Sequence, residues 1–181
     1  MATSTQPVLE TARLRLRPYE AGDLDAMAEM FGDPEVTAFT YLGRQDREGT
    51  ARVVTEYREF HLANGFGMYA ILDGATGDYY GEAGLFVPPA AASAEFLALR
   101  YALNRAAWGK GIATEASSAV IEDAFGRLEK PAIIAGVVPD NLPSMRVMDR
   151  LGFARGPEVT SGAHTYAVFT LTREAWRSRT R

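Results

Sequence analysis

The stretch Trp108-Gly109-Lys110-Gly111-Ile112-Ala113-Thr114-Glu115-Ala116 decides the fold, because it joins a run of strand-forming residues to a run of helix formers. Its two closely spaced glycines allow backbone N–H groups to point into one concavity. The helix that follows adds its unpaired first-turn N–H groups and the positive end of its dipole. The stretch therefore predicts a site for a phosphate or pyrophosphate group, with a tight turn that binds nothing as the alternative.

This loop differs from the two common nucleotide-binding motifs. The Walker pattern G-x-x-x-x-G-K-[ST] does not occur in it. The dinucleotide pattern G-x-G-x-x-G would need a third glycine at position 114, where the chain has Thr. Both nucleotide hydrolysis and hydride transfer are therefore disfavoured.

A second polar cluster, residues 140–146, follows the next strand-like run at residues 132–138. Neighbouring parallel strands end at the same edge of a sheet, which is where α/β proteins bind ligands. Asn141 offers a hydrogen-bond donor and an acceptor, and Ser144 offers a hydroxyl. The alternatives are a simple helix N-cap for Asn141 and a solvent-facing hydroxyl for Ser144.

The remaining pattern predicts an α/β protein. Strands are expected at residues 13–17, 66–72, 79–87, 96–103, 132–138 and 166–171, and helices at about 24–31, 46–64, 112–127 and 143–151. Consecutive strands in the middle and one strand–helix–strand crossover indicate a mixed sheet with an antiparallel half and a locally parallel pair. One domain over residues 1–181 is expected, with residues 1–8 and 178–181 as frayed tails.

Composition narrows the possible chemistry. The 181 residues are 47% hydrophobic and 23% charged, with a net charge of -4, two His and no Cys. Absence of Cys excludes disulfides, Cys-ligated zinc, iron–sulfur clusters and a thiol nucleophile, and two His make a multi-His metal site unexpected. The charge does not indicate nucleic-acid binding. With no signal-peptide pattern and no long apolar run, we expect a cytoplasmic protein with no membrane partner.

Taken together, these segments resemble the GNAT superfamily of acyl-CoA-dependent N-acyltransferases. The resemblance is greatest to the RimJ/RimL-type subgroup, named for acetyltransferases of ribosomal-protein N-termini. It covers nearly the whole chain and rests on five pieces: LETARLRLR at residues 9–17, WGKGIATEA at 108–116, NLPS at 141–144, LGF at 151–153 and LTREAW at 171–176.

The resemblance implies a mostly antiparallel sheet with a splayed pair of parallel strands, flanked by about four helices, and acetyl-CoA as the co-substrate in the gap. Backbone N–H groups of the strand ending near Leu103 would then polarise the thioester carbonyl. The implied pyrophosphate ligands are the amides of Trp108, Gly109, Lys110, Gly111, Ile112, Ala113 and Thr114. Asn141 would bind the pantetheine arm, and the side chains of Lys110 and Arg146 are candidates for outer phosphate contacts.

The implied reaction is direct attack of a primary amine on the thioester, with no acyl-enzyme and no metal. Ser144 would lie near the sulfur as general acid or thiolate-positioning group. Tyr101, which aligns with a tyrosine of the family, is the other candidate catalytic residue. The acceptor is a protein N-terminus or a small-molecule amine, and the protein is a monomer or a homodimer. A longer acyl-CoA, or a CoA-binding module without turnover, are the alternatives.

The general base is left unassigned. Many relatives carry a Glu close to the aligned tyrosine, where this chain has Ala98. Glu95 lies three residues earlier, an offset that puts it on the other face of a regular strand. The substitutes considered are Glu82, His164 and Tyr166. Acceptor specificity is expected from the loops at residues 37–46 and 88–93, with Phe39, Tyr41 and Phe66 as candidate pocket aromatics, although most such aromatics belong to the core.

Overall fold

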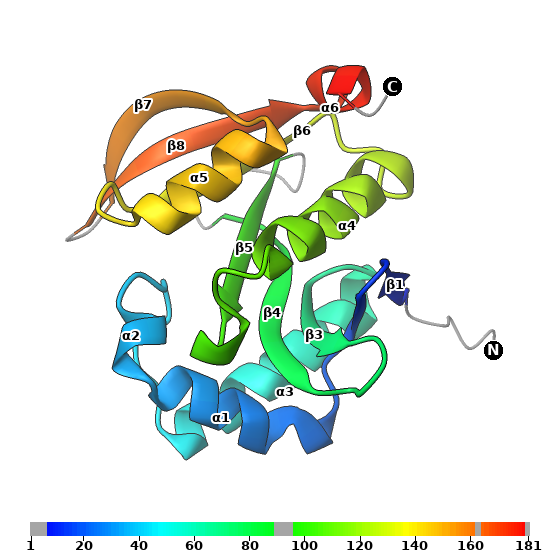
Figure 1. Cartoon of the computed structure of the whole chain (residues 1–181), viewed down its shortest axis with the longest axis vertical. Coiled ribbons are helices and arrows are strands. Elements are labelled where there is room, and N and C mark those ends of the chain that lie inside the picture. The colour runs from blue at the N-terminus through cyan, green and yellow to red at the C-terminus, as the bar shows by residue number, and fades with distance from the viewer. Residues whose placement is uncertain (1–6, 89–95, 162–163, 180–181) are drawn as a thin grey trace. The chain divides into compact units, whose positions relative to one another are not determined.

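The computed structural model describes residues 7–88, 96–161 and 164–179. It contains two compact units. The first consists of Met1–Gly84 and Tyr101–Ala119, and the second of Leu85–Arg100 and Val120–Arg181. Each unit is described by itself below, with elements labelled as in Figure 1.

The first unit contains an antiparallel set of strands with helices between them. Antiparallel pairs join β1 to β2, β2 to β3 and β3 to β4. The strands are β1 (Leu9–Glu10), β2 (Leu14–Pro18), β3 (Met68–Asp73) and most of β4 (Tyr79–Phe86), followed by the last residues of β5 (Leu97–Leu103). The helices are α1 (Leu24–Gly32), α2 (Pro34–Thr37), α3 (Arg47–Asn64) and the start of α4 (Ile112–Gly126), with 3-10 turns at Ala21–Asp23 and Arg105–Ala107.

The second unit contains the parallel pair. The first residues of β5 pair in parallel with β6 (Ala132–Val137), which pairs antiparallel with β8 (His164–Thr172), and β8 pairs antiparallel with β7 (Ala154–Ser161). The unit also holds the rest of α4, together with α5 (Leu142–Leu151) and α6 (Arg173–Arg179).

The predicted mixed α/β fold is confirmed. Over the described ranges, eight strands have the hydrogen-bonded order β1-β2-β3-β4-β5-β6-β8-β7, mostly antiparallel with β5–β6 as the parallel pair. The four expected helices are α1, α3, α4 and α5, and the described residues add the short helices α2 and α6. Helix α6 continues to Arg179, whose guanidinium donates to the carbonyl of Arg150, so helix extends into the expected C-terminal tail.

The β5–β6 pair is parallel, as the family resemblance implies, over a short register. Within the second unit, the parallel register joins Leu97 to Ile133 and Ala98 to Ile134. The described residues of the two strands have no further parallel partners, although β5 runs on to Leu103 and β6 to Val137. Parallel pairing is therefore confined to the start of each strand.

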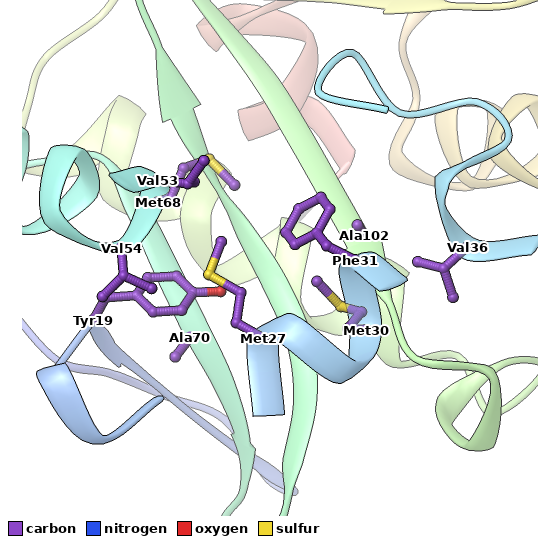
Figure 2. Close-up of a cluster of buried hydrophobic side chains, with 10 residues drawn as sticks. All are labelled: Tyr19, Met27, Met30, Phe31, Val36, Val53, Val54, Met68, Ala70 and Ala102. Atoms are coloured by element: carbon purple, nitrogen blue, oxygen red, sulfur yellow. The ribbon is translucent and has the colours of Figure 1, made fainter. Parts of the chain in front are cut away.

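A hydrophobic cluster fills the interior of the first unit (Figure 2). Helix α1 contributes Met27, Met30 and Phe31, which the three- and four-residue spacing brings to one face. All three side chains are at most 2% exposed. The cluster is completed by Tyr19, Val36, Val53, Val54, Met68, Ala70 and Ala102.

Helix α3 has the ends that its sequence predicts. The Asp46 carboxylate accepts the N–H of Gly49 at 2.7 Å, and Gly65 ends the helix with a left-handed φ of 70°. Asp23 occupies the N-cap position of α1, as its residue type suggests, but its side chain makes no cap bond. Its carboxylate instead accepts two bonds of 2.7 Å from the Arg17 guanidinium. A two-point, charge-assisted pair is stronger than a single cap bond.

The β3–β4 turn is organised by Asp73. Its carboxylate accepts the N–H groups of Ala75 and Thr76 at 2.8 and 2.9 Å and the hydroxyl of Tyr80 at 2.7 Å. These bonds stabilise the charged form and lower the pKa of Asp73 to about 2. The stability that they contribute is complete above the unfolded pKa of about 3.9 and is lost as the pH falls through about 2.

We therefore expect the Asp73 carboxyl to titrate with a midpoint near pH 2 when it is followed by NMR. The stability difference between the wild type and Asp73→Asn should be the same at pH 7 and pH 5 and should shrink below pH 4. A midpoint near 4 would show that the three hydrogen bonds do not persist in solution.

No helix in the described ranges is both long enough and apolar enough to cross a membrane. Over those same residues, no group of three or more His, Cys, Asp or Glu side chains is arranged to hold a metal ion.

Candidate functional site

The glycine loop, residues 108–111, is fixed to the end of β5 in the first unit. The indole N–H of Trp108 donates to the carbonyl of Leu103 at 2.8 Å, so the loop folds back on the strand that precedes it. Asn104 supports the same turn, because its side chain accepts the N–H of Ala107 at 3.2 Å and donates to the carbonyl of Tyr79 at 2.7 Å. These side-chain hydrogen bonds therefore fix the start of the glycine loop to β4 and to the end of β5.

Both loop glycines have the backbone conformation that the sequence suggests. Gly109 and Gly111 have φ values of 72° and 77°, in the left-handed region that other residues rarely adopt. Together with Lys110 they are exposed. Helix α4 begins directly afterwards, and the N–H of Glu115 makes its first intrahelical bond, to the carbonyl of Gly111. The N–H groups of the first turn precede that bond and therefore have no partner within the helix.

Tyr101 and Leu103 lie on the last part of β5, where β4 approaches closely. A Cβ atom on Gly81 of β4 would lie 2.2 Å from the carbonyl oxygen of Ala102, so only glycine fits there. Leu103 is buried, and Tyr101 is half-buried with its hydroxyl oxygen shielded from solvent. The strand end that the resemblance assigns to the thioester is therefore held against β4.

Asn141, Ser144 and Arg146 lie at the start of α5 in the second unit. The Asn141 side-chain carbonyl accepts the backbone N–H of Ser144 at 3.2 Å, so Asn141 is the N-cap of α5. Its amide Nδ2 has no hydrogen-bond partner among the described residues. Ser144 is half-buried and Arg146 is exposed. Capping therefore uses the side-chain carbonyl oxygen of Asn141 and does not use its Nδ2 donor.

The predicted site residues thus form two sets. The first unit holds Tyr101, Leu103 and residues 108–114, whereas the second holds Asn141, Ser144 and Arg146. Within each set, a hydrogen bond joins residues that the sequence had placed near one another.

The substitutes considered for the general base lie in different environments. Glu82 is 1% exposed, and the Tyr19 hydroxyl donates to its carboxylate at 3.3 Å while lying 2.8 Å from the Tyr79 hydroxyl. Burial raises the pKa of both tyrosines well above the usual value. Glu82 is therefore an interior residue of the first unit.

The other positions considered for the base are in the second unit. Ala98 is buried in the parallel register of β5. His164 is exposed at the start of β8, with its ring 6.2 Å from that of Tyr166. Glu95 lies outside the described residues. No residue is assigned as the base.

The aromatic side chains expected at an acceptor pocket differ in how far they are exposed to solvent. Phe66 is buried and packs edge-on against Phe60, with ring centroids 5.4 Å apart, so it belongs to the core. Phe39 and Tyr41 are 45% and 72% exposed in the segment between α2 and α3. Most of the loop at residues 88–93 lies outside the described residues.

The sequence did not predict a polar network that joins the start of β2 to the glycine loop. The Arg13 guanidinium contacts the Glu115 carboxylate and the Lys110 carbonyl, and the Thr11 hydroxyl also donates to Glu115. The separation of Arg13 and Glu115, 102 positions along the chain, explains why no local pattern could reveal this contact. The only signal was that both residues lie in pieces that carry the family resemblance.

Comparison with known proteins identifies the family. The profile of the acetyltransferase (GNAT) domain matches residues 13–154. The chain is 30% identical over 149 residues to a Bacillus licheniformis protein named uncharacterized N-acetyltransferase p20, covering 81% of this chain and 82% of that protein. It also resembles the crystal structure of an acetyltransferase from Agrobacterium tumefaciens, with 28% identity, a TM-score of 0.80 and coverage of 92% and 95% of the two chains.

A third comparison concerns the fold alone. RimL, an α-N-acetyltransferase of ribosomal protein L7/L12 solved in complex with coenzyme A, has a TM-score of 0.80 at 16% identity. The match covers 93% of this chain and 99% of RimL. Because the domain profile spans most of the sequence, the chain belongs to the family of acetyltransferase (GNAT) domains and is an acetyltransferase.

Proposed function

We propose that this acetyltransferase transfers an acetyl group from acetyl-CoA to a primary amine, either a protein N-terminus or a small molecule. The glycine loop carries the proposal, because two left-handed glycines directly before α4 leave backbone amides at the positive end of a helix. The pyrophosphate of coenzyme A is an anion of the kind that such a loop attracts. The relative p20 is itself named an N-acetyltransferase.

The residues present have the right chemistry to bind acetyl-CoA. Backbone amides between Gly109 and Thr114 would bind the pyrophosphate, and the exposed glycines leave that backbone accessible. The N–H of Trp108, expected in the same set, instead donates to the Arg105 carbonyl at 3.1 Å. In the second unit, the Asn141 amide would bind the pantetheine arm and Arg146 an outer phosphate. The Lys110 side chain, exposed in the loop, would add a second cation.

Acetyl-CoA supplies the activated acyl group as a thioester. In the proposed reaction the amine nitrogen forms a bond to the acyl carbon, and the carbon–sulfur bond breaks. Backbone N–H groups near Leu103 would stabilise negative charge on the carbonyl oxygen. The Ser144 hydroxyl, or that of Tyr101, would donate a proton to the departing thiolate, and the amine proton would leave to an unassigned base.

Ser144→Ala is expected to lower kcat at least about tenfold while changing the Kd for acetyl-CoA less than about threefold, as loss of a proton donor predicts. The variant should fold normally, since Asn141 caps α5 through the backbone N–H of Ser144 rather than through its hydroxyl. Steady-state kinetics and calorimetry measure the two effects. An equal loss in kcat and in affinity would instead assign Ser144 to binding alone.

Ala98 favours a second candidate function, a CoA-binding module without turnover. It is buried in β5 and brings no carboxylate to the strand before the glycine loop. A panel of amines separates the two functions, using thiol release and mass spectrometry with acetyl-CoA and with a longer acyl-CoA. Peptides beginning with Ser and Ala are suitable first acceptors, because two structural neighbours are named for ribosomal-protein-serine and S5-alanine acetylation.

An acetylated product, with release of one thiol for each acetyl group transferred, supports the proposed transferase. Tight acetyl-CoA binding with no product from any amine in the panel would instead support the module without turnover. A product formed only with the longer acyl-CoA would show that the donor, rather than the type of reaction, had been misassigned.

A further inference from the structure

We propose that Arg13 is a positioning residue for acetyl-CoA binding, which neutralises Glu115 at the start of α4 and fixes the orientation of a peptide group in the glycine loop. This inference rests on the proposed function, because it concerns how the loop receives the phosphates of acetyl-CoA. Every residue that it uses lies in the first unit.

The contacts of Arg13 are extensive for a half-exposed side chain. Its Nε donates to Glu115 Oε2 at 2.7 Å, its Nη2 lies 2.5 Å from the same oxygen, and its backbone N–H donates to Glu115 Oε1 at 3.2 Å. Thr11 completes the set by donating its hydroxyl to Oε1 at 2.6 Å. The Glu115 carboxylate is therefore held by two residues of the β1–β2 segment.

The charge of Glu115 makes this pairing relevant to function. Glu115 lies in the first turn of α4, next to the amides that would bind an anionic ligand. Burial alone would raise its pKa, but the bonds from Thr11 and Arg13 outweigh burial and lower it. Glu115 is thus negatively charged at neutral pH, and without Arg13 that charge would repel the phosphates at close range.

Arg13 also acts on the loop backbone. Its Nη1 donates to the carbonyl of Lys110 at 3.1 Å. That carbonyl belongs to the same peptide group as the N–H of Gly111, and in a trans peptide the two bonds point in opposite directions. Because the carbonyl points toward Arg13, the Gly111 N–H is directed away from it, as a donor to a ligand requires.

The sheet holds Arg13 in this position. Its carbonyl accepts the N–H of Gly74 at 2.8 Å, and its neighbour Leu14 pairs with Asp73 in the β2–β3 register. A Cβ atom on Gly74 would lie only 3.1 Å from the Arg13 carbonyl oxygen, so the β3–β4 turn packs closely on this residue. The guanidinium therefore extends toward the glycine loop from a backbone that the sheet holds in place.

The test is a double-mutant cycle with Arg13→Gln, Glu115→Gln and the double variant. We expect Arg13→Gln to raise the Kd and KM for acetyl-CoA about tenfold, as one uncompensated charge at a helix terminus would, with kcat and the amine KM unchanged. The double variant, which also lacks the negative charge of Glu115, should recover most of the affinity for acetyl-CoA. Glu115→Gln alone should bind acetyl-CoA at least as tightly as the wild type.

Two further measurements separate electrostatic positioning from general destabilisation. The loss in Arg13→Gln should diminish in high salt, because screening weakens the repulsion from Glu115. Arg52→Gln is the matched control: Arg52 pairs with Glu48 at 2.8 Å on the exposed surface of α3, and its loss should change neither the Kd nor the KM.

Unchanged acetyl-CoA affinity in Arg13→Gln, measured beside a wild type that binds, would overturn the inference. So would a double variant that binds as weakly as Arg13→Gln. If Arg13→Gln does not fold, Glu115→Gln decides alone, and weakened binding in that variant would contradict the neutralising role. A wild type that does not bind acetyl-CoA would instead overturn the proposed function, and this inference with it.

Discussion

Gly111→Glu is expected to abolish acetyl-CoA binding, raising the Kd at least about 100-fold while the protein still folds. Gly111 has a φ of 77°, a conformation that costs an L-residue about 1 to 2 kcal/mol. A Cβ at this position would also lie 3.7 Å from the Arg13 guanidinium. The new carboxylate would therefore compete with Glu115 for Arg13 and would place a second negative charge in the phosphate loop.

Gly77→Glu provides a control matched in both strain and charge. Gly77 has a φ of 79°, it is exposed in the β3–β4 turn, and a Cβ atom on it would meet nothing within 4 Å. We expect the two variants to have similar melting temperatures, with acetyl-CoA affinity lost only in Gly111→Glu when both are measured by calorimetry. Equal affinity in the two variants would remove the glycine loop from the donor site.

Asn141→Ser is expected to raise the Kd for acetyl-CoA about tenfold with little change in melting temperature. Serine is as good an N-cap as asparagine, so the bond to the Ser144 N–H can be kept. The substitution removes the Nδ2 donor, which is the group proposed to bind the pantetheine arm. Affinity and stability should therefore change independently.

Asn141→Ala tests the capping role and the ligand-binding role of Asn141 together. It removes the cap as well as the donor, so it should lower the free energy of unfolding by about 0.5 to 2 kcal/mol in addition to weakening binding. Denaturant unfolding and acetyl-CoA titration on the same samples give both quantities. If Asn141→Ser binds as tightly as the wild type, Asn141 is a helix cap and nothing more.

Local sequence patterns were sufficient for the elements whose boundaries depend on neighbouring residues. Helix α3 begins directly after Asp46 and ends directly before Gly65, because a carboxylate cap and a left-handed glycine act within one turn of the helix. The glycine loop was predictable for the same reason, since Gly109 and Gly111 adopt conformations that the residue type itself permits. Asn141 and Ser144 were placed together at the start of a helix, and they lie there.

Contacts that depend on tertiary structure or on the path between elements were not predictable in this way. Asp23 lies at the N-cap position of α1, but its carboxylate is bound by the guanidinium of Arg17, six residues earlier, in a pair that depends on the path from β2 into α1. Glu82 was considered as a base, yet it is buried beside Tyr19, a residue 63 positions earlier that directly follows β2. The Arg13–Glu115 pair depends in the same way on tertiary structure.

Titration calorimetry of the wild-type protein with acetyl-CoA, with coenzyme A and ATP in parallel, tests the central claim most directly. The proposed donor site predicts micromolar binding of acetyl-CoA and of coenzyme A, and at least about 100-fold weaker binding of ATP, which lacks the pantetheine arm. Absence of heat and of any thermal shift with both CoA species would contradict the claim. This acetyltransferase fold would then bind a different ligand.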